Sequence, residues 1–314
     1  MKLTQNNTES RRHRILHTLI LLLCAMIWGF AFVSQSVGAE YVDAFTFLAG
    51  RSWIAVIFLL PVIAAADRIR RRKGLPAGGP PTRARRNLYL LGGVSCGTAL
   101  FLASAAQQIG ISYTTTAKAG FITALYVVIV PVISVFLGQA PSRRIWLCVL
   151  IGIIGLYFLC MTGGPEEINR GDGLMIICAL LFSGQILLVG HFNSMMDGIR
   201  LSFLEMLTEA VLATVCIFFF EKPTAGAIRS ALPALLYAGV MSSGVAYTLQ
   251  IIGQEGLDPT IASLTMCLES VFSAIGGFLL LGQTLTLREF LGCTLMFAAI
   301  VISQMPERLR VRGG

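Results

Sequence analysis

The chain has 314 residues, of which 55% are hydrophobic and 13% are charged, and its formal net charge is +8. Soluble domains carry about 25% charged residues, so this composition excludes an ordinary soluble enzyme and indicates an integral membrane protein. The basic excess does not indicate nucleic-acid binding, because the Lys and Arg residues lie in short clusters between apolar runs.

Ten apolar runs are long enough to be considered as membrane spans, since a spanning helix needs about 20 mostly apolar residues. The first run follows a basic segment but is too long for the apolar part of a cleaved signal peptide, so we expect it to remain as a span. The runs predict an all-α integral membrane protein with ten transmembrane helices. They cover residues 15–37, 44–65, 88–109, 115–137, 145–161, 173–190, 202–220, 231–252, 260–281 and 288–304.

The placement of basic residues sets the expected orientation. If the N-terminus lies inside, the outside segments carry only Arg170, Lys222, Arg229 and Arg288. The inside loop between the second and third spans alone carries more, namely Arg68, Arg70, Arg71, Arg72, Lys73, Arg83, Arg85 and Arg86. Inside loops are the positive ones in membrane proteins. We therefore expect a multi-pass protein of the cell membrane with both termini cytoplasmic, and we interpret the basic loop as an anchor on anionic lipid.

Two segments about 144 residues apart share one pattern. Each has a long apolar run, a Gly-Gln turn, an Arg and a second apolar run, with Gly138-Gln139 matching Gly282-Gln283 and Arg144 matching Arg288. The repeat divides the chain into residues 1–164 and 165–314, with five spans in each half. Because five is odd, the second half would have the opposite orientation. Such inverted repeats are typical of secondary transporters.

Four segments resemble the drug/metabolite transporter superfamily, in its EamA branch. They are MIWGFAFVSQ, FTFLAGRSWIA, KAGFITALYVVIVPVIS and FLLLGQTLT. The resemblance implies ten helices in two inverted repeats and a central cavity lined mainly by helices 1–4 and 6–9. It also implies that helices 5 and 10 are peripheral. The sequence departs from the family pattern at Gln139 and Gln283, where Glu is usual, and in helix 9, where Glu269-Ser270 stands in the stretch that usually holds Pro.

A charged residue inside a span indicates a functional or structural role, because placing its side chain in the membrane costs about 2.5–3.5 kcal/mol on insertion scales. Glu269 falls near the middle of its span, and on a continuous helix it would share a face with Thr265 and Ser273. It is our first candidate for a substrate contact or proton carrier, a structural hydrogen bond being the alternative. Glu209 is the second proton-coupling candidate. Glu205 shares its helix face but lies close enough to the cytoplasmic end to sit in a hydrated rim.

Two basic residues also fall inside spans. Lys118 lies near the outer end of the fourth span, where it could contact substrate or extend its amine to the interface. Arg51 lies in the outer half of the second span. The inverted topology places Arg51 and Glu205 toward opposite faces, so we expect no direct ion pair between them.

Polar and aromatic side chains recur at helical spacing on several spans. One stripe consists of Ser243, Tyr247, Gln250 and Gln254; others pair Ser104 with Gln108 and align Trp28, Phe32 and Gln35. Such stripes must face protein or water rather than lipid, although core packing is the alternative for the aromatic residues. The predicted substrate-binding residues are Trp28, Phe32, Gln35, Gln108, Lys118, Tyr126, Glu209, Tyr247, Gln250 and Glu269.

These observations predict a secondary transporter that works by alternating access, expected to export a small polar or amphipathic metabolite such as an amino acid. No cofactor is expected, and the expected partners are the substrate and the bilayer; a homodimer is left open. One alternative is an intramembrane enzyme, in which His191 and Ser243 would form a hydrolase pair. The other is a receptor or scaffold, which the short extramembrane segments disfavour. The three His residues lack metal-site spacing, and no Walker A loop is present.

Overall fold

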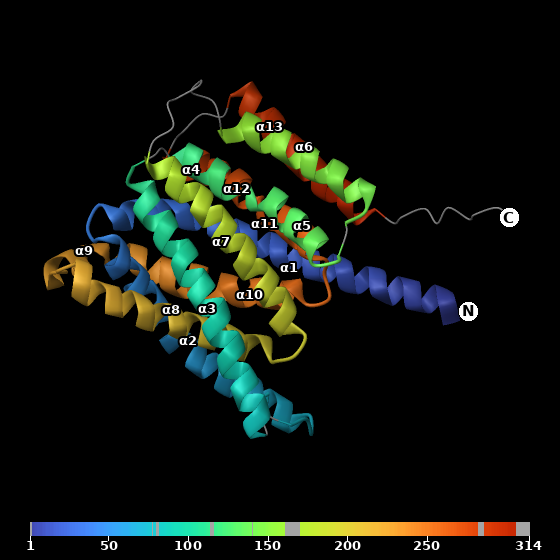
Figure 1. The fold of residues 1–314 in the computed structure, drawn as a ribbon, viewed down its shortest axis with the longest axis horizontal. Helices are drawn as coiled ribbons and strands as arrows, with labels where there is room; N and C mark the ends of the chain where they lie inside the picture. The colour runs from blue at the N-terminus through green and yellow to red at the C-terminus, as the bar shows by residue number, and fades with distance from the viewer. Residues whose placement is uncertain are drawn as a thin grey trace.

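The computed structural model describes residues 2–76, 78–79, 82–113, 116–139, 141–160, 170–281 and 286–305, and this part of the chain is helical throughout, without strands (Figure 1). Eight of the described helices are long and apolar enough to cross a membrane, and residues Gly120–Phe136 form a shorter apolar helix. The expected all-α membrane protein is therefore confirmed, whereas the arrangement of ten spans in two repeats stays a prediction.

Helices succeed one another with short connections along the described chain. The first half forms α1 (Lys2–Ala39), α2 (Ala44–Arg72), α3 (Arg83–Ile111), α4 (Thr116–Thr123), α5 (Tyr126–Phe136) and α6 (Arg143–Cys160). The second half forms α7 (Arg170–Asn193), α8 (Gly198–Phe220), α9 (Ala225–Leu236), the π-helix η1 (Tyr237–Ala246), α10 (Tyr247–Gln254), α11 (Pro259–Met266), α12 (Glu269–Leu281) and α13 (Leu287–Gln304).

Side-chain caps fix several of these helix starts. Asp197 accepts from the Arg200 N–H at the start of α8. Thr286 and Glu289 form a capping box at the start of α13, each side chain bonding the other's backbone N–H. Caps of this kind satisfy backbone donors that a helix leaves free in its first turn.

Helices α2 and α8 pair antiparallel, and polar contacts join them from end to end. At the start of α2, the Glu221 carboxylate accepts the backbone N–H groups of Phe45 and Thr46, both at 2.7 Å. At the far end of the pair, Arg200 forms an ion pair with Asp67. These contacts connect two elements that are more than 100 residues apart in the chain, so they hold the two halves of the chain together.

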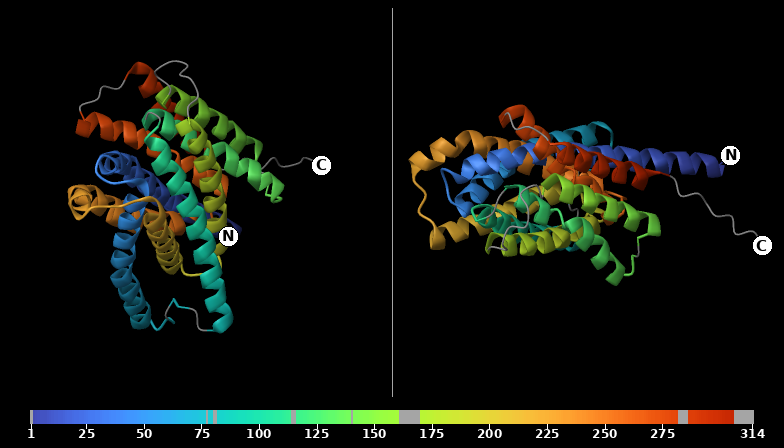
Figure 2. Two further views of the ribbon diagram at one scale, coloured as in Figure 1. Left: turned by 60° about the vertical axis from the view of Figure 1, so that its left-hand side comes forward. Right: turned by 90° about the horizontal axis from the view of Figure 1, so that it is seen from above.

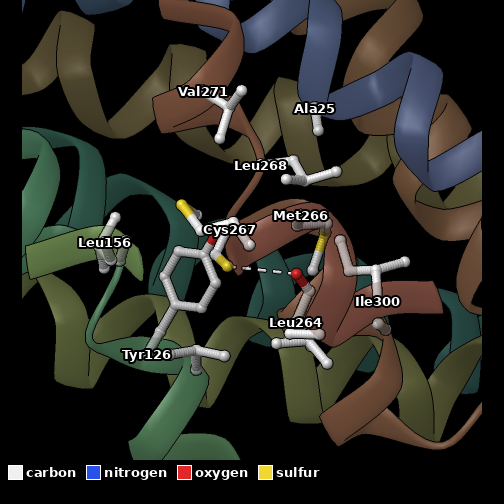
Figure 3. Close-up of a cluster of buried hydrophobic side chains, with 14 of the residues drawn as sticks. Ala25, Tyr126, Leu156, Leu264, Met266, Cys267, Leu268, Val271 and Ile300 are labelled. Atoms are coloured by element: carbon white, nitrogen blue, oxygen red, sulfur yellow. Dashed lines mark hydrogen bonds between the residues drawn. The ribbon is translucent and has the colours of Figure 1, made fainter. Parts of the chain in front are cut away.

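Helices α6 and α13 lie side by side at one edge of the molecule (Figures 1 and 2). Their closest approach is at Gly155 and Gly292, where a Cβ on either glycine would come within 3 Å of the carbonyl oxygen of the other. Next to this pair lies the largest buried hydrophobic cluster, to which α1, α5, α6, α7, α11, α12 and α13 contribute (Figure 3).

Two of the expected spans are broken near their middle. The run at 115–137 divides into α4 and α5 at Ala124–Leu125, and the run at 260–281 divides into α11 and α12 at Cys267–Leu268. At both breaks the backbone hydrogen bonds shorten to i−3 spacing, as in Val128 N–H to Leu125 O and Ser270 N–H to Cys267 O. The expectation that Thr265, Glu269 and Ser273 share one face of a continuous helix is therefore wrong.

The expected span at 231–252 is also irregular. Pro233 has no backbone N–H to donate, and four residues later the helix widens into η1. In η1, Gly239 lets the backbone approach α2, since a Cβ there would meet Ile54 and the carbonyl of Arg51. The wider turn changes which side chains face inward, so Ser243 does not continue the stripe expected from α-helical spacing.

Candidate substrate-binding cavity

One cavity lies among helices from both halves of the chain. It is lined by side chains from α1, α2, α3, α4, α5, α7, η1, α10, α11 and α12. Its volume is about 40 Å³, which is room for a few waters rather than a metabolite. No described lining residue comes from α6 or α13, as the resemblance implied for helices 5 and 10. Helix α8 contributes none either, whereas the resemblance placed helix 7 at the cavity.

Seven of the residues predicted to bind substrate line this cavity, although their role in binding stays a prediction. Aromatic rings and amides dominate the wall. The Trp28 and Tyr247 rings meet edge to face with centroids 4.8 Å apart, an arrangement that adds to the burial energy of both rings. The seven residues are Trp28, Phe32, Gln35, Tyr126, Tyr247, Gln250 and Glu269.

The other three predicted residues lie elsewhere. Gln108 is buried in α3 outside the cavity lining, and the adjacent Gln107 lines the cavity instead. A rotation of about 100° per helical residue separates these two side chains. Glu209 also lies outside the lining, and the side chain of Lys118 falls outside the described part of the structure. The turn that contains Gln283 also lies outside the described residues.

Arg51 and Glu209 form a buried ion pair that the sequence interpretation missed. The Arg51 guanidinium lies 2.9 Å from the Glu209 carboxylate, and the side chains are 3% and 0% exposed. The second Glu209 oxygen accepts from Ser52, and Arg51 also donates to Ser104. The sequence did contain a sign of this pair, because a lone Arg inside a span requires an acidic partner. Glu209, one helical turn from Glu205, is that partner.

Glu205 lies behind the cavity wall rather than in a hydrated rim, since its side chain is 0% exposed. The hydrated rim, which was one of the alternatives for Glu205, is therefore excluded. One Glu205 oxygen accepts from the Gln185 amide at 2.7 Å, and the other has no partner. Gln185 in turn accepts from Gln250 at 3.1 Å. Both amides line the cavity, so Glu205 fixes the orientation of a group on its wall.

Glu269 and Tyr126 connect the two helix breaks. Each is the first residue after its break, Tyr126 in α5 and Glu269 in α12, and the Tyr126 hydroxyl donates to Glu269 at 3.2 Å. Figure 3 shows the Tyr126 ring beside the second break, where the Cys267 thiol donates to the Leu264 carbonyl. This arrangement offers a ligand a carboxylate and a phenol.

Catalytic and metal chemistry find little support among the described residues. The Ser243 hydroxyl has no hydrogen-bond partner, so it does not make the contact with His191 that the hydrolase alternative requires. No described group of three or more His, Cys, Asp or Glu residues is placed to hold a metal ion.

Comparisons with known proteins agree with this architecture. The model of the EamA-like transporter family matches residues 16–161 and 169–305. An uncharacterized transporter of Archaeoglobus fulgidus is 29% identical over 294 residues, covering 92% of this chain and 86% of the relative. The uncharacterized transporter YoaV of Bacillus subtilis is 21% identical over 90% of this chain and 94% of its own. A solved crystal structure has a TM-score of 0.73 at 17% identity, covering 91% of this chain and 96% of its own.

Proposed function

Because the chain belongs to the EamA-like transporter family, we propose that it is a secondary transporter that exports a small polar or amphipathic metabolite, such as an amino acid or a related compound. The observation that carries this proposal is the cavity lined by both halves of the chain at the point where two broken helices meet. Transporters with inverted repeats bind substrate at such a place and expose it alternately to the two sides.

The proposal includes ten spans in two inverted repeats, residues 1–164 and 165–314. Three observations support it. The family model matches the chain twice, once in each half. The breaks at Ala124–Leu125 and Cys267–Leu268 fall at corresponding places in the two halves. Helices that would be equivalent also pack together, α2 against α8 and α6 against α13.

We further propose that the protein lies in the cell membrane with both termini cytoplasmic. The support is the concentration of Lys and Arg in the segments that this orientation places inside. The cavity volume of about 40 Å³ is smaller than the roughly 300 Å³ or more of a usual ligand pocket. Binding would then widen the cavity.

Glu269 is the residue that we propose to couple transport to protons. It is a carboxylate on the cavity wall whose described polar contact is a neutral phenol, so it can lose a proton when substrate binds and regain it afterwards. Glu209 is less suited to that role, because both of its oxygens are engaged by Arg51 and Ser52.

Transport by purified protein in liposomes tests the function. A thermal-shift screen against a metabolite library would supply the substrate, and its uptake would be measured with and without a pH gradient. Phe32→Ala should weaken transport about 5- to 150-fold, since removing an aromatic ring from a binding site costs on the order of 1–3 kcal/mol. The matched control is Phe218→Ala, whose ring is 83% exposed on α8. Equal losses in both variants, or no uptake of any compound that binds, would contradict the proposal.

A further inference from the structure

We propose, building on the transport function above, that the cavity selects a ligand carrying one positive charge and a neutral hydrogen-bond acceptor, such as an amino alcohol, and discriminates against anions. The inference concerns the chemical class of the substrate. It follows from the balance of charges around the cavity, from its aromatic wall and from two donors on that wall that have no partner.

For the described residues, the charge balance around the cavity is negative when Glu205 and Glu269 are ionised. Among the described residues, the charged side chains at the wall or directly behind it are Arg51, Glu205, Glu209 and Glu269. Arg51 is neutralised by Glu209 at 2.9 Å. Glu205 and Glu269 are buried, and the hydrogen bonds described for them come from an amide and a phenol rather than from a cation. A buried carboxylate without a counter-ion favours a bound cation or a proton, and an anion there would add repulsion.

The wall suits an organic cation better than a metal ion. Trp28, Phe32, Tyr126 and Tyr247 all line the cavity. The faces of aromatic rings attract ammonium groups, by about 0.5–2 kcal/mol for each favourable contact. The same rings would pack against the apolar part of an amphipathic amine. Glu269 lies on the same wall, so a carboxylate and several rings are available to one ammonium group.

Two buried donors on the wall indicate that the ligand also carries an acceptor. The Nε–H of Arg51, in a side chain that is 3% exposed, has no hydrogen-bond partner, and neither has the Nε1–H of Trp28. Both residues line the cavity, and buried donors are rarely left unpaired. Because Glu209 already balances the Arg51 charge, a neutral hydroxyl or carbonyl oxygen suffices to satisfy these donors, and a carboxylate is not required.

A series of four compounds with one benzyl group tests the inference on purified wild-type protein. Phenylalaninol carries an amine and a hydroxyl, 2-phenylethylamine an amine alone, 2-phenylethanol a hydroxyl alone, and 3-phenylpropionate a carboxylate. Dissociation constants from thermal shifts should be at least about tenfold lower for phenylalaninol than for 2-phenylethanol, since a charged hydrogen bond is worth about 1.5–3 kcal/mol. The anion should be the weakest ligand. If the anion binds most tightly, or if neither amine binds better than 2-phenylethanol, the inference is wrong.

Matched variants assign the charge preference to the cavity. Glu269→Gln should weaken binding of the amines about tenfold and leave 2-phenylethanol unchanged, whereas Glu255→Gln, at an exposed turn, should change neither. An equal loss in both variants would overturn the assignment. Lys118→Gln completes the set: an amine preference that appears only in that variant would mean that Lys118 neutralises Glu269 in the native protein, which also contradicts the inference.

Transport separates the two proposals. If the amines bind selectively but no compound that binds is carried across liposomes, the proposed transport function fails and the cation site stands. If 3-phenylpropionate or another anion is carried in preference to the amines, the transport function stands and the inference about charge fails.

Discussion

The Arg51–Glu209 pair is the charged contact at the centre of the α2–α8 interface. Replacing Arg51 with Gln leaves the Glu209 carboxylate buried without a cation, which should lower the free energy of unfolding by about 3–5 kcal/mol. Glu209→Gln should have a similar cost because it leaves Arg51 unpaired. The double variant should lose less than the sum of the two single variants, since neither charge is then left alone.

Thermal unfolding in detergent measures these differences. Arg68→Gln is the matched control, because Arg68 lies on the same helix with an exposed side chain, and changes at such positions stay within about 0.5 kcal/mol. If Arg51→Gln and Arg68→Gln unfold at the same temperature, the buried pair does not stabilise the protein.

Local spacing predicted individual cavity residues better than it predicted their partners. Trp28, Phe32 and Gln35 lie on one helix face, and placing them required only the period of an α-helix. The Arg51–Glu209 pair depends on how α2 and α8 align along their whole length, which no local pattern contains. The same limit explains why Gln107, rather than Gln108, reaches the cavity, because the rotation of α3 about its axis is set by its neighbours.

At the scale of whole helices, the contact between Gly155 and Gly292 sets how closely α6 and α13 approach. A Cβ on Gly155 would lie 2.8 Å from the Gly292 carbonyl oxygen, so Gly155→Ala must move one helix away from the other. We expect a loss of about 1–3 kcal/mol in the free energy of unfolding, the usual cost of overpacking. Small residues are the usual means of close helix approach in membranes.

Gly184→Ala is the control for this helix contact. A Cβ on Gly184 in α7 would meet nothing within 4 Å, and Ala favours helix over Gly by about 1 kcal/mol. This variant should therefore unfold at the same temperature as the wild type or slightly higher. If Gly155→Ala unfolds at the same temperature as Gly184→Ala, α6 and α13 can move apart without lowering the stability of the protein, which would contradict this prediction.

Helix positions followed from the apolar runs, but helix interruptions did not. The run around Tyr126 is uniformly apolar, and nothing in its composition marks the break before that residue; the single Pro of α5, Pro131, comes five residues later. After the break, α5 packs against α11 and α7, and this tertiary packing is not visible in the local sequence. Pro233 did give a local reason for irregularity in its span, yet the π-helix that follows also requires the close approach of Gly239 to α2.

For the molecule as a whole, the proposed topology makes a prediction that requires no substrate. Reporter domains fused after Arg86 and after Arg310 should both be cytoplasmic, whereas one fused after Glu221, which follows the seventh span, should be external. Activity of paired cytoplasmic and periplasmic or extracellular reporters measures this directly. A fusion after Arg310 that reports outside would contradict the ten-span arrangement, because an even number of spans returns the chain to its starting side.

The distance in sequence between Arg51 and Glu209 has a consequence for the synthesis of the protein. The two residues are 158 positions apart, so at about 5–20 residues per second a ribosome needs roughly 10–30 s after making α2 before it makes the partner in α8. Throughout that interval the Arg51 guanidinium of α2 lacks the acidic partner that it has in the finished protein. We therefore expect the newly inserted first half to be less stable than it is in the finished protein until α8 supplies Glu209.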